Sequence, residues 1–245
     1  MKVDILASGS GGNVIAIRSS GNTLLVDVGI AKTKIEKRLL EVGVRPDSID
    51  AILITHAHSD HVKGLPLANK YRIPIFASEG EWKSMKGVDP ELRRIMTSNQ
   101  LINNFDITTF NVHHDAFEPI GYSIIDKFGD KVSVCLDTGK VDSEMMETMK
   151  NSDFLIMESN HEPAMLKHSK YPNSVKARIL SNIGHLSNKQ SAEALSKLIK
   201  GTGEKIFLTH LSSQNNLPEL AKLTTIRALN KKGFKPEIDY EIEVC

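Results

Sequence analysis

The chain has 245 residues, of which 40% are hydrophobic and 25% charged, and 31 Lys and Arg against 30 Asp and Glu give a formal charge of +1. This composition is that of an ordinary globular protein, and the near-neutral charge excludes nucleic-acid binding through a global basic excess, although a local basic patch is compatible with it. Cys135 and Cys245 are too few for a disulfide framework and lack the paired spacing of a thiolate zinc site. No apolar run reaches the roughly 18–20 residues of a membrane helix. The N-terminus does not have the pattern of a signal peptide. We therefore expect a cytoplasmic protein without membrane contact.

The first third of the chain predicts strands followed by a helix. Short apolar runs at 3–7, 14–18 and 23–27, separated by turn-forming residues, indicate a β-meander. Residues 32–42 carry apolar side chains at helical spacing and stop at Gly43. A strand at 51–54 follows.

The remaining two thirds predict a second series of strands and helices. Apolar runs indicate strands at 73–77, 105–112, 120–125, 131–136 and 153–157. Ser187 and Gln190 have the spacing of a capping box at the start of an amphipathic helix, which is followed by a strand at 205–209, a helix at 217–230 and an alternating strand at 238–244. Without a long linker, the chain is expected to form a single domain, residues 1–245, with two sheets face to face and helices outside.

The segment after strand 51–54 contains His56, His58, Asp60 and His61. Imidazole nitrogen and carboxylate oxygen are the ligands that zinc-like ions favour. His56 and His58 are two positions apart and project to the same side of an extended chain, so they can share one ion. Asp60 and His61 are then available to a neighbouring ion. We interpret the segment as a metal-binding loop rather than a histidine-rich surface loop.

This His-x-His-x-Asp-His pattern resembles the signature of the metallo-β-lactamase fold superfamily, and the resemblance runs the length of the chain. It implies an α/β protein with the metallo-β-lactamase fold, a four-layer αββα sandwich. Later residues match the superfamily's motifs in order: Asp27 as a residue that orients the metal loop, and His114, Asp137 and His210 as ligands. The resemblance implies that His56, His58 and His114 hold one ion, that Asp60, His61 and His210 hold the other, and that Asp137 bridges them. His113 competes with His114, which we prefer because Asp115 and Ala116 follow it.

Further motifs resemble the YycJ (WalJ) group of bacterial metallohydrolases, whose members are described as double-stranded DNA exonucleases. These motifs are residues 8–13, 158–161, 184–188 and 210–216. Glu158 and His185 also resemble a glutamate–histidine pair of the tRNA 3′-processing endonucleases, where the pair assists departure of the leaving oxygen. The chain departs from the patterns at Gln214, where the group usually has Glu, and it lacks the long substrate arm of the tRNA enzymes and the cap domain of the β-CASP relatives.

The residues indicate a two-metal hydrolase. Two divalent ions, Zn²⁺ or Mn²⁺, can share a hydroxide near neutral pH and polarise a phosphoryl oxygen, and Asp60 can accept the proton. A phosphodiester releases an alkoxide, which needs a proton from a group such as His185, held by Glu158. The catalytic residues are therefore expected to be Asp60, His185 and Glu158. An amide- or thioester-cleaving enzyme has less need of the pair, so the pair favours phosphodiesters.

The sequence leaves two substrate classes open. The leading interpretation is a nucleic acid, namely DNA cleaved by an exonuclease, and the alternative is a small cyclic or linear nucleotide. A non-phosphate metallohydrolase and a metal-binding module without catalysis are the weaker alternatives. The glycine-rich segment 8–13 is either a tight turn or a phosphate-binding loop. Five lysines form either a phosphate-binding rim or a solvated surface: Lys63, Lys140, Lys167, Lys170 and Lys176. The sequence allows a homodimer.

Overall fold

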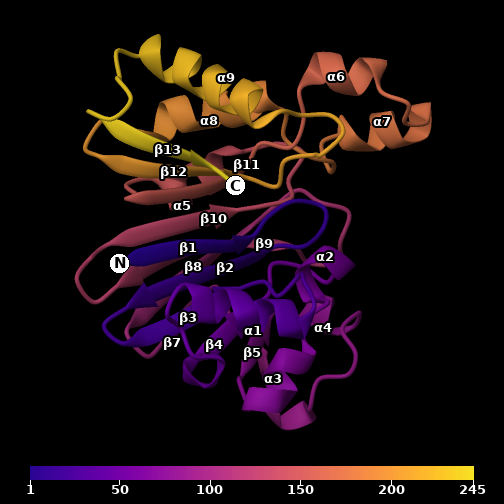
Figure 1. Cartoon of the computed structure of the whole chain (residues 1–245), viewed down its shortest axis with the longest axis vertical. Coiled ribbons are helices and arrows are strands. Elements are labelled where there is room, and N and C mark those ends of the chain that lie inside the picture. Colours follow the sequence, from indigo (N-terminus) through magenta and orange to yellow (C-terminus); the bar gives the residue numbers. More distant parts are fainter. The chain divides into compact units, whose positions relative to one another are not determined.

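The computed structural model describes residues 1–245 and divides into two compact units. Unit 1 contains residues 1–109, 116–120 and 124–129. Unit 2 contains residues 110–115, 121–123 and 130–245. Figure 1 shows the elements of both units coloured along the chain.

Unit 1 contains a six-stranded sheet with the order β1-β2-β3-β4-β5-β6. Its strands are β1 (Lys2–Ala7), β2 (Val14–Ser19), β3 (Asn22–Val26), β4 (Ala51–Leu53), β5 (Ile75–Ala77) and β6 (Arg93–Ile95). The first three are antiparallel, as the predicted meander requires, and β3 to β6 are parallel. Parallel neighbours need crossover connections, which here contain α1 (Lys32–Glu41), α2 (Ser59–Val62), α3 (Pro66–Tyr71) and α4 (Glu79–Trp82).

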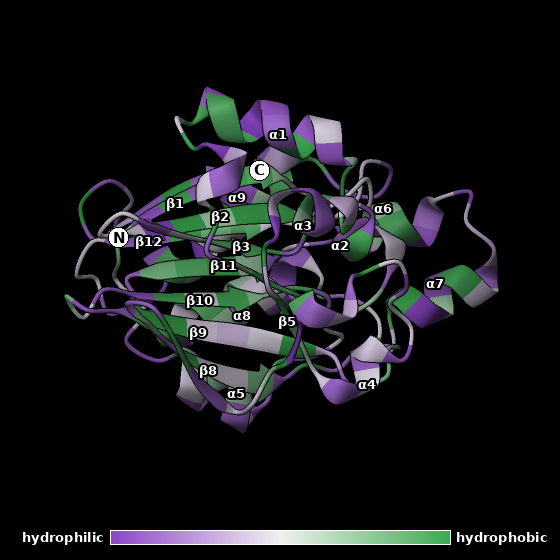
Figure 2. Cartoon of the chain, turned by 90° about the horizontal axis from the view of Figure 1, so that it is seen from below, coloured by the Kyte–Doolittle hydropathy of each residue, from purple (hydrophilic) through white to green (hydrophobic).

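The core of unit 1 forms where helix α1 covers this sheet. Ile35 and Leu39 of α1 are fully buried in one apolar cluster with Leu25 of β3 and Ile52 of β4. In Figure 2, α1 carries both hydrophilic and hydrophobic colours along its length, as expected for a helix with one buried face. This packing fixes the ends of β3 and β4, from which Asp27 and the histidine segment emerge.

The second sheet has seven strands in the order β13-β12-β11-β10-β9-β8-β7. They are β7 (Asn99–Ile102), β8 (Phe105–Asn111), β9 (Ile120–Asp126), β10 (Lys131–Cys135), β11 (Phe154–Glu158), β12 (Glu204–Thr209) and β13 (Tyr240–Val244). The last four strands of the chain are parallel. Parallel strands place their carboxyl ends at one edge, so the segments that begin at Asp137, Glu158 and His210 leave the sheet on the same side.

Helices of unit 2 cover its parallel strands. Leu195 and Leu198 of α8 (Asn188–Leu198) and Leu229 of α9 (Pro218–Asn230) share a buried cluster with Leu155 and Ile206 of the sheet. Helix α5 (Ser143–Met149) contributes to the same cluster. The predicted capping box at the start of α8 is confirmed, because the Ser187 and Gln190 side chains make both of its hydrogen bonds.

Each predicted strand and helix is present, with ends shifted by a few residues, and several short elements were not predicted. The short elements are α2, α3, α4, α5, α6 (Pro163–His168), α7 (Asn173–Ile179), β6, β7 and the 3₁₀ turns η1 (Pro46–Ser48) and η2 (Pro90–Leu92). The last strand begins at Tyr240 rather than at Ile238, whose side chain is exposed. None of the helices is long and apolar enough to cross a membrane.

Candidate metal centre

The histidine segment of unit 1 follows β4 and is held by Asp27 at the end of β3. The Asp27 carboxylate accepts hydrogen bonds from the Thr55 backbone N–H (2.9 Å), the Thr55 hydroxyl (2.8 Å) and His61 Nδ1 (2.7 Å). The Thr55 hydroxyl oxygen in turn lies 3.1 Å from His56 Nδ1. Asp27 is fully buried, and burial raises the pKa of its carboxyl against the opposing effect of these hydrogen bonds. Asp27 thus ties the Thr55 backbone and the His61 ring to the end of β3.

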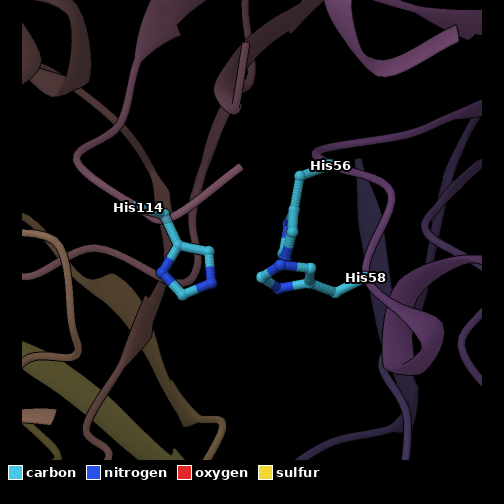
Figure 3. Close-up of side chains that lie close together, drawn as sticks. All are labelled: His56, His58 and His114. Atoms are coloured by element: carbon cyan, nitrogen blue, oxygen red, sulfur yellow. The ribbon is translucent and has the colours of Figure 1, made fainter. Parts of the chain in front are cut away.

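A second carboxylate, Glu81 of α4, supports the same segment and was not predicted. One of its oxygens accepts the Ala57 backbone N–H at 2.7 Å, and the other accepts the Glu118 backbone N–H at 2.7 Å. The side chain is buried. Ala57 lies between His56 and His58, whose ring centroids are 4.6 Å apart (Figure 3). Nothing in the sequence around Glu81 distinguishes it from the exposed Glu79, so only the fold reveals it.

The glycine-rich segment 8–13 packs closely on the metal loop through its backbone. The Asn13 backbone N–H donates to the Asp60 carbonyl (2.8 Å), and the Asn13 side-chain nitrogen lies 3.2 Å from His61 Nε2. A Cβ atom at Gly29 would lie 1.7 Å from the Asp60 carbonyl oxygen. Gly12 has a φ of +134°, and a Cβ there would lie 2.3 Å from the Gly29 oxygen. The glycines therefore permit close backbone approach around Asp60.

In unit 2, four loops bring the remaining candidate residues together. The ring centroid of His185 lies 5.2 Å from those of both His114 and His210. The Asp137 carboxylate lies 2.8 Å from His210 Nδ1 and 3.7 Å from His114 Nε2. His113, the competitor of His114, instead lies 2.6 Å from Asp142 through Nε2.

Glu158 connects three of these loops. One oxygen accepts the backbone N–H groups of Thr138 (2.7 Å) and Leu186 (3.0 Å). The other lies 3.0 Å from His185 Nδ1 and 3.2 Å from His210 Nδ1. The carboxylate is fully buried, so it is an acceptor for protein groups rather than a surface acid.

The charges around Glu158 set the protonation of its neighbours. Burial alone would raise the pKa of Glu158, but the charge and hydrogen bond of His185 and the hydrogen bond of His210 lower it to about 2. Burial lowers the pKa of His185, and the Glu158 charge and hydrogen bond more than offset this, so the pKa is raised. Burial lowers the pKa of His114, which keeps its imidazole neutral, the form that binds metals. These directions favour an ionised Glu158 beside a protonated His185.

Backbone strain also marks the site. Asp27, Asp137 and His210 are non-glycine residues with φ of +58°, +45° and +55°. Each lies one or two residues after the end of a strand. Left-handed backbone at a non-glycine residue costs on the order of 1–3 kcal/mol. The surrounding hydrogen bonds hold these conformations, which turn the chain sharply where the strand ends.

An asparagine network supports the unit 2 loops and explains three of the subgroup motifs. The Asn188 and Asn216 side chains exchange hydrogen bonds of 2.9 and 2.8 Å. Asn188 also accepts the Ser159 hydroxyl (2.7 Å), and Asn160 Nδ2 donates to the His210 carbonyl (3.0 Å). Residues 158–161, 185–188 and 210–216 are therefore cross-linked by side chains that belong to none of the candidate metal-binding groups.

The other singled-out residues lie outside these contacts. His168 is exposed and bonds the Ala164 carbonyl, Gln214 is exposed, and His161 is buried with no hydrogen-bond partner at either ring nitrogen. Four of the five lysines are exposed and Lys176 is half-buried. Lys63 belongs to unit 1, whereas the other four belong to unit 2.

The donor set fits divalent metal ions. Three histidines use Nδ1 for a hydrogen bond within the protein. His56 bonds the Thr55 hydroxyl, His61 bonds Asp27, and His114 bonds the Gly184 carbonyl. Metal-binding histidines characteristically bond a protein group through one nitrogen and the metal through the other. In these three histidines the nitrogen that could bind a metal is Nε2. Within unit 2, four side chains could together hold an ion: Asp137, Glu158, His185 and His210.

A family model described as a β-lactamase superfamily domain matches residues 22–211. The chain belongs to the metallo-β-lactamase superfamily. It is 38% identical to exodeoxyribonuclease WalJ of Streptococcus pneumoniae (strain D39) over 98% of this chain and 93% of that protein. It is 36% identical to exodeoxyribonuclease YycJ of Bacillus anthracis over 97% of this chain and 92% of that protein. The metallo-β-lactamase fold protein YhfI of Bacillus subtilis has a TM-score of 0.75 at 15% identity, covering 99% of this chain and 95% of that one.

These similarities confirm the predicted family, the α/β metallo-β-lactamase fold and the enzyme class. The chain is a metal-dependent hydrolase that uses divalent metal ions held by histidines and aspartates. The predicted resemblance to the YycJ (WalJ) group is confirmed as well, because two proteins of that name match nearly the whole chain.

Proposed function

We propose that this chain is a dinuclear metal-dependent phosphodiesterase that acts on nucleic acid as a DNA exonuclease. The observation that carries the proposal is the buried Glu158 carboxylate, 3.0 Å from Nδ1 of His185, in a chain 38% identical to an exodeoxyribonuclease over 98% of its length. An enzyme that expels an alkoxide needs such a proton donor.

The two ions would use the ligands that the family resemblance implied. His56, His58 and His114 would hold one ion, Asp60, His61 and His210 the other, and Asp137 would contact both. Asp27 would orient His61 through their 2.7 Å contact. Residues 1–245 would act as one hydrolase domain. When bound, two Zn²⁺ or Mn²⁺ ions supply a hydroxide near neutral pH and polarise a phosphoryl oxygen.

The protein side chains would perform the proton transfers. Asp60 would accept the proton of the attacking water. Glu158 accepts from His185 Nδ1, so the proton available to the substrate is carried by Nε2 and would pass to the departing alkoxide oxygen. Glu158 is a positioning residue, because its oxygens are occupied by four protein groups.

A substrate panel with metal analysis tests the proposal. We expect purified protein to hold close to two ions per chain. With Zn²⁺ or Mn²⁺ it should cleave labelled duplex DNA from an end, in preference to RNA and cyclic nucleotides. Asp137→Ala should abolish cleavage while the protein stays folded, and the exposed His168→Ala is the matched control. If the protein turns over a cyclic nucleotide efficiently and cleaves no DNA, it is a small-nucleotide phosphodiesterase and the exonuclease proposal is wrong. An active preparation with one ion or none per chain would rule out a dinuclear centre.

A further inference from the structure

Residues 163–184, which contain α6 and α7, form a basic arm on unit 2. The arm contains Lys167, Lys170, Lys176 and Arg178 and no Asp or Glu, although the whole chain has a charge of only +1. Figure 1 shows α6 and α7 extending past the ends of the parallel strands β11 and β12 of the same unit. The arm therefore concentrates positive charge at the edge of the sheet where Glu158 leaves β11.

The lysine charges of the arm are not used within the protein. Lys167 and Lys170 are exposed and belong to no ion pair. Lys176 Nζ donates to the Lys167 carbonyl at 2.8 Å, which ties α7 to the end of α6. Only Arg178 is paired, with Asp115 at 2.7 Å. Unpaired lysines without an acidic neighbour in the segment are suited to an anionic ligand.

The arm is joined firmly to the candidate proton donor. The His185 backbone N–H donates to the Ile179 carbonyl at the end of α7 (3.0 Å). A Cβ at Gly184 would lie 2.2 Å from the Arg178 carbonyl oxygen, so this residue must be glycine for the arm to pack there. The Gly184 carbonyl in turn bonds His114 Nδ1 (3.3 Å). The position of the arm is therefore set relative to both histidines.

We infer that this arm binds the sugar–phosphate backbone of duplex DNA beside the bond to be cleaved, with Lys167 and Lys170 contacting phosphates. The inference rests on the proposed function, and it identifies where the polymer is held. A nuclease that follows a duplex must neutralise several phosphates, and the overall charge of +1 cannot supply this. The arm supplies this positive charge locally, at a fixed position relative to His185.

The test compares two double variants that remove the same charge. Lys167→Gln/Lys170→Gln alters the arm, and Lys231→Gln/Lys232→Gln alters two exposed lysines after α9 in the same unit. For each we would measure binding of a labelled duplex by anisotropy, KM for its cleavage between low and physiological salt, and kcat/KM for bis(p-nitrophenyl) phosphate. Thermal unfolding checks that both variants are folded.

We expect the arm variant to raise the Kd and KM for duplex DNA on the order of tenfold or more and to reduce the slope of log affinity against log salt by about 2, roughly one per lysine. The ratio of DNA to small-diester kcat/KM should fall in the arm variant alone. Equal Kd, KM and salt slope in the two variants would overturn the inference while leaving the exonuclease proposal intact. If the wild type binds duplex DNA through the arm but cleaves no DNA, only the exonuclease proposal is overturned. If the wild type binds no duplex DNA, both the inference and the exonuclease proposal are overturned.

Discussion

The backbone N–H of Ala57 donates a 2.7 Å hydrogen bond to the carboxylate of Glu81, which is only 1% exposed. The other Glu81 oxygen accepts a second backbone N–H, from Glu118. Glu81 therefore fixes the peptide between His56 and His58, although it belongs to none of the candidate metal-binding groups. Groups that orient metal ligands in this way typically contribute 10- to 100-fold to metal affinity.

Replacing Glu81 by Gln should weaken metal binding. The amide has one acceptor oxygen and an NH₂ group, so one of the two backbone N–H groups loses its partner. We expect a 10- to 100-fold loss of metal affinity and a loss of about 1–3 kcal/mol in the free energy of unfolding. Metal titration of the chelator-treated protein and denaturant unfolding measure the two effects. Glu79→Gln, on the exposed face of the same helix, is the control; identical metal affinities in the two variants would show that the bond to Ala57 does not position the loop.

Removing the His185 imidazole should affect substrates according to their leaving group. His185→Ala deletes the proposed proton donor, so turnover of an ordinary phosphodiester should fall about 10²–10⁴-fold. A diester with a nitrophenolate leaving group should lose much less, because nitrophenolate departs without a proton. The measurement is kcat for both substrates in wild type and variant at equal metal content. Equal losses on the two substrates would leave His185 as a binding or structural residue.

The asparagine network should be important for stability. Asn188→Ala removes the acceptor of the buried Ser159 hydroxyl and one of several partners of Asn216, whose side chain keeps its bonds to the Ser159 carbonyl and the Leu217 N–H. A buried polar group without a partner costs about 1–3 kcal/mol, so the free energy of unfolding should fall by about that amount. Denaturant unfolding measures it, with the exposed neighbour variant Lys189→Ala as control. If both variants unfold alike, water replaces the lost contacts and the network is not a structural requirement.

His161 should make the protein less stable in mild acid. Its side chain is buried, and burial lowers its pKa from 6.5 to about 4. Below about pH 6.5 the unfolded chain binds a proton at His161 that the folded chain does not bind until about pH 4, so stability falls as the pH falls through this window. At pH about 5 the loss from this residue is about 2 kcal/mol.

The variant His161→Phe removes the titrating group and keeps an aromatic ring. The difference in unfolding free energy between variant and wild type should shift in favour of the variant as the pH is lowered from about 7.5 to about 5. Denaturant unfolding of the two proteins at matched metal content measures this difference. A difference that stays constant with pH would mean that His161 binds its proton as readily in the folded chain as in the unfolded chain.

The sequence by itself determined the family and the candidate ligands of this protein. His56, His58, Asp60 and His61 lie within six residues of one another, so their shared chemistry is visible without a fold. The alternating and helical patterns likewise predicted the long elements, because burial of one face repeats every two residues in a strand and about every 3.6 in a helix.

Only the tertiary structure decided which residues hold that loop and what the remaining motifs do. Glu81 contacts Ala57 across 24 positions, and Asn188 meets Asn216 across 28. Such contacts depend on where helices and strand ends meet, and a local pattern carries no record of them. The charge of the arm was equally hidden, because four cations in residues 163–184 are offset elsewhere in a chain whose total is +1. Their exposure and their connection to His185 follow from how α7 packs on the Gly184 backbone, which is a property of the folded chain alone.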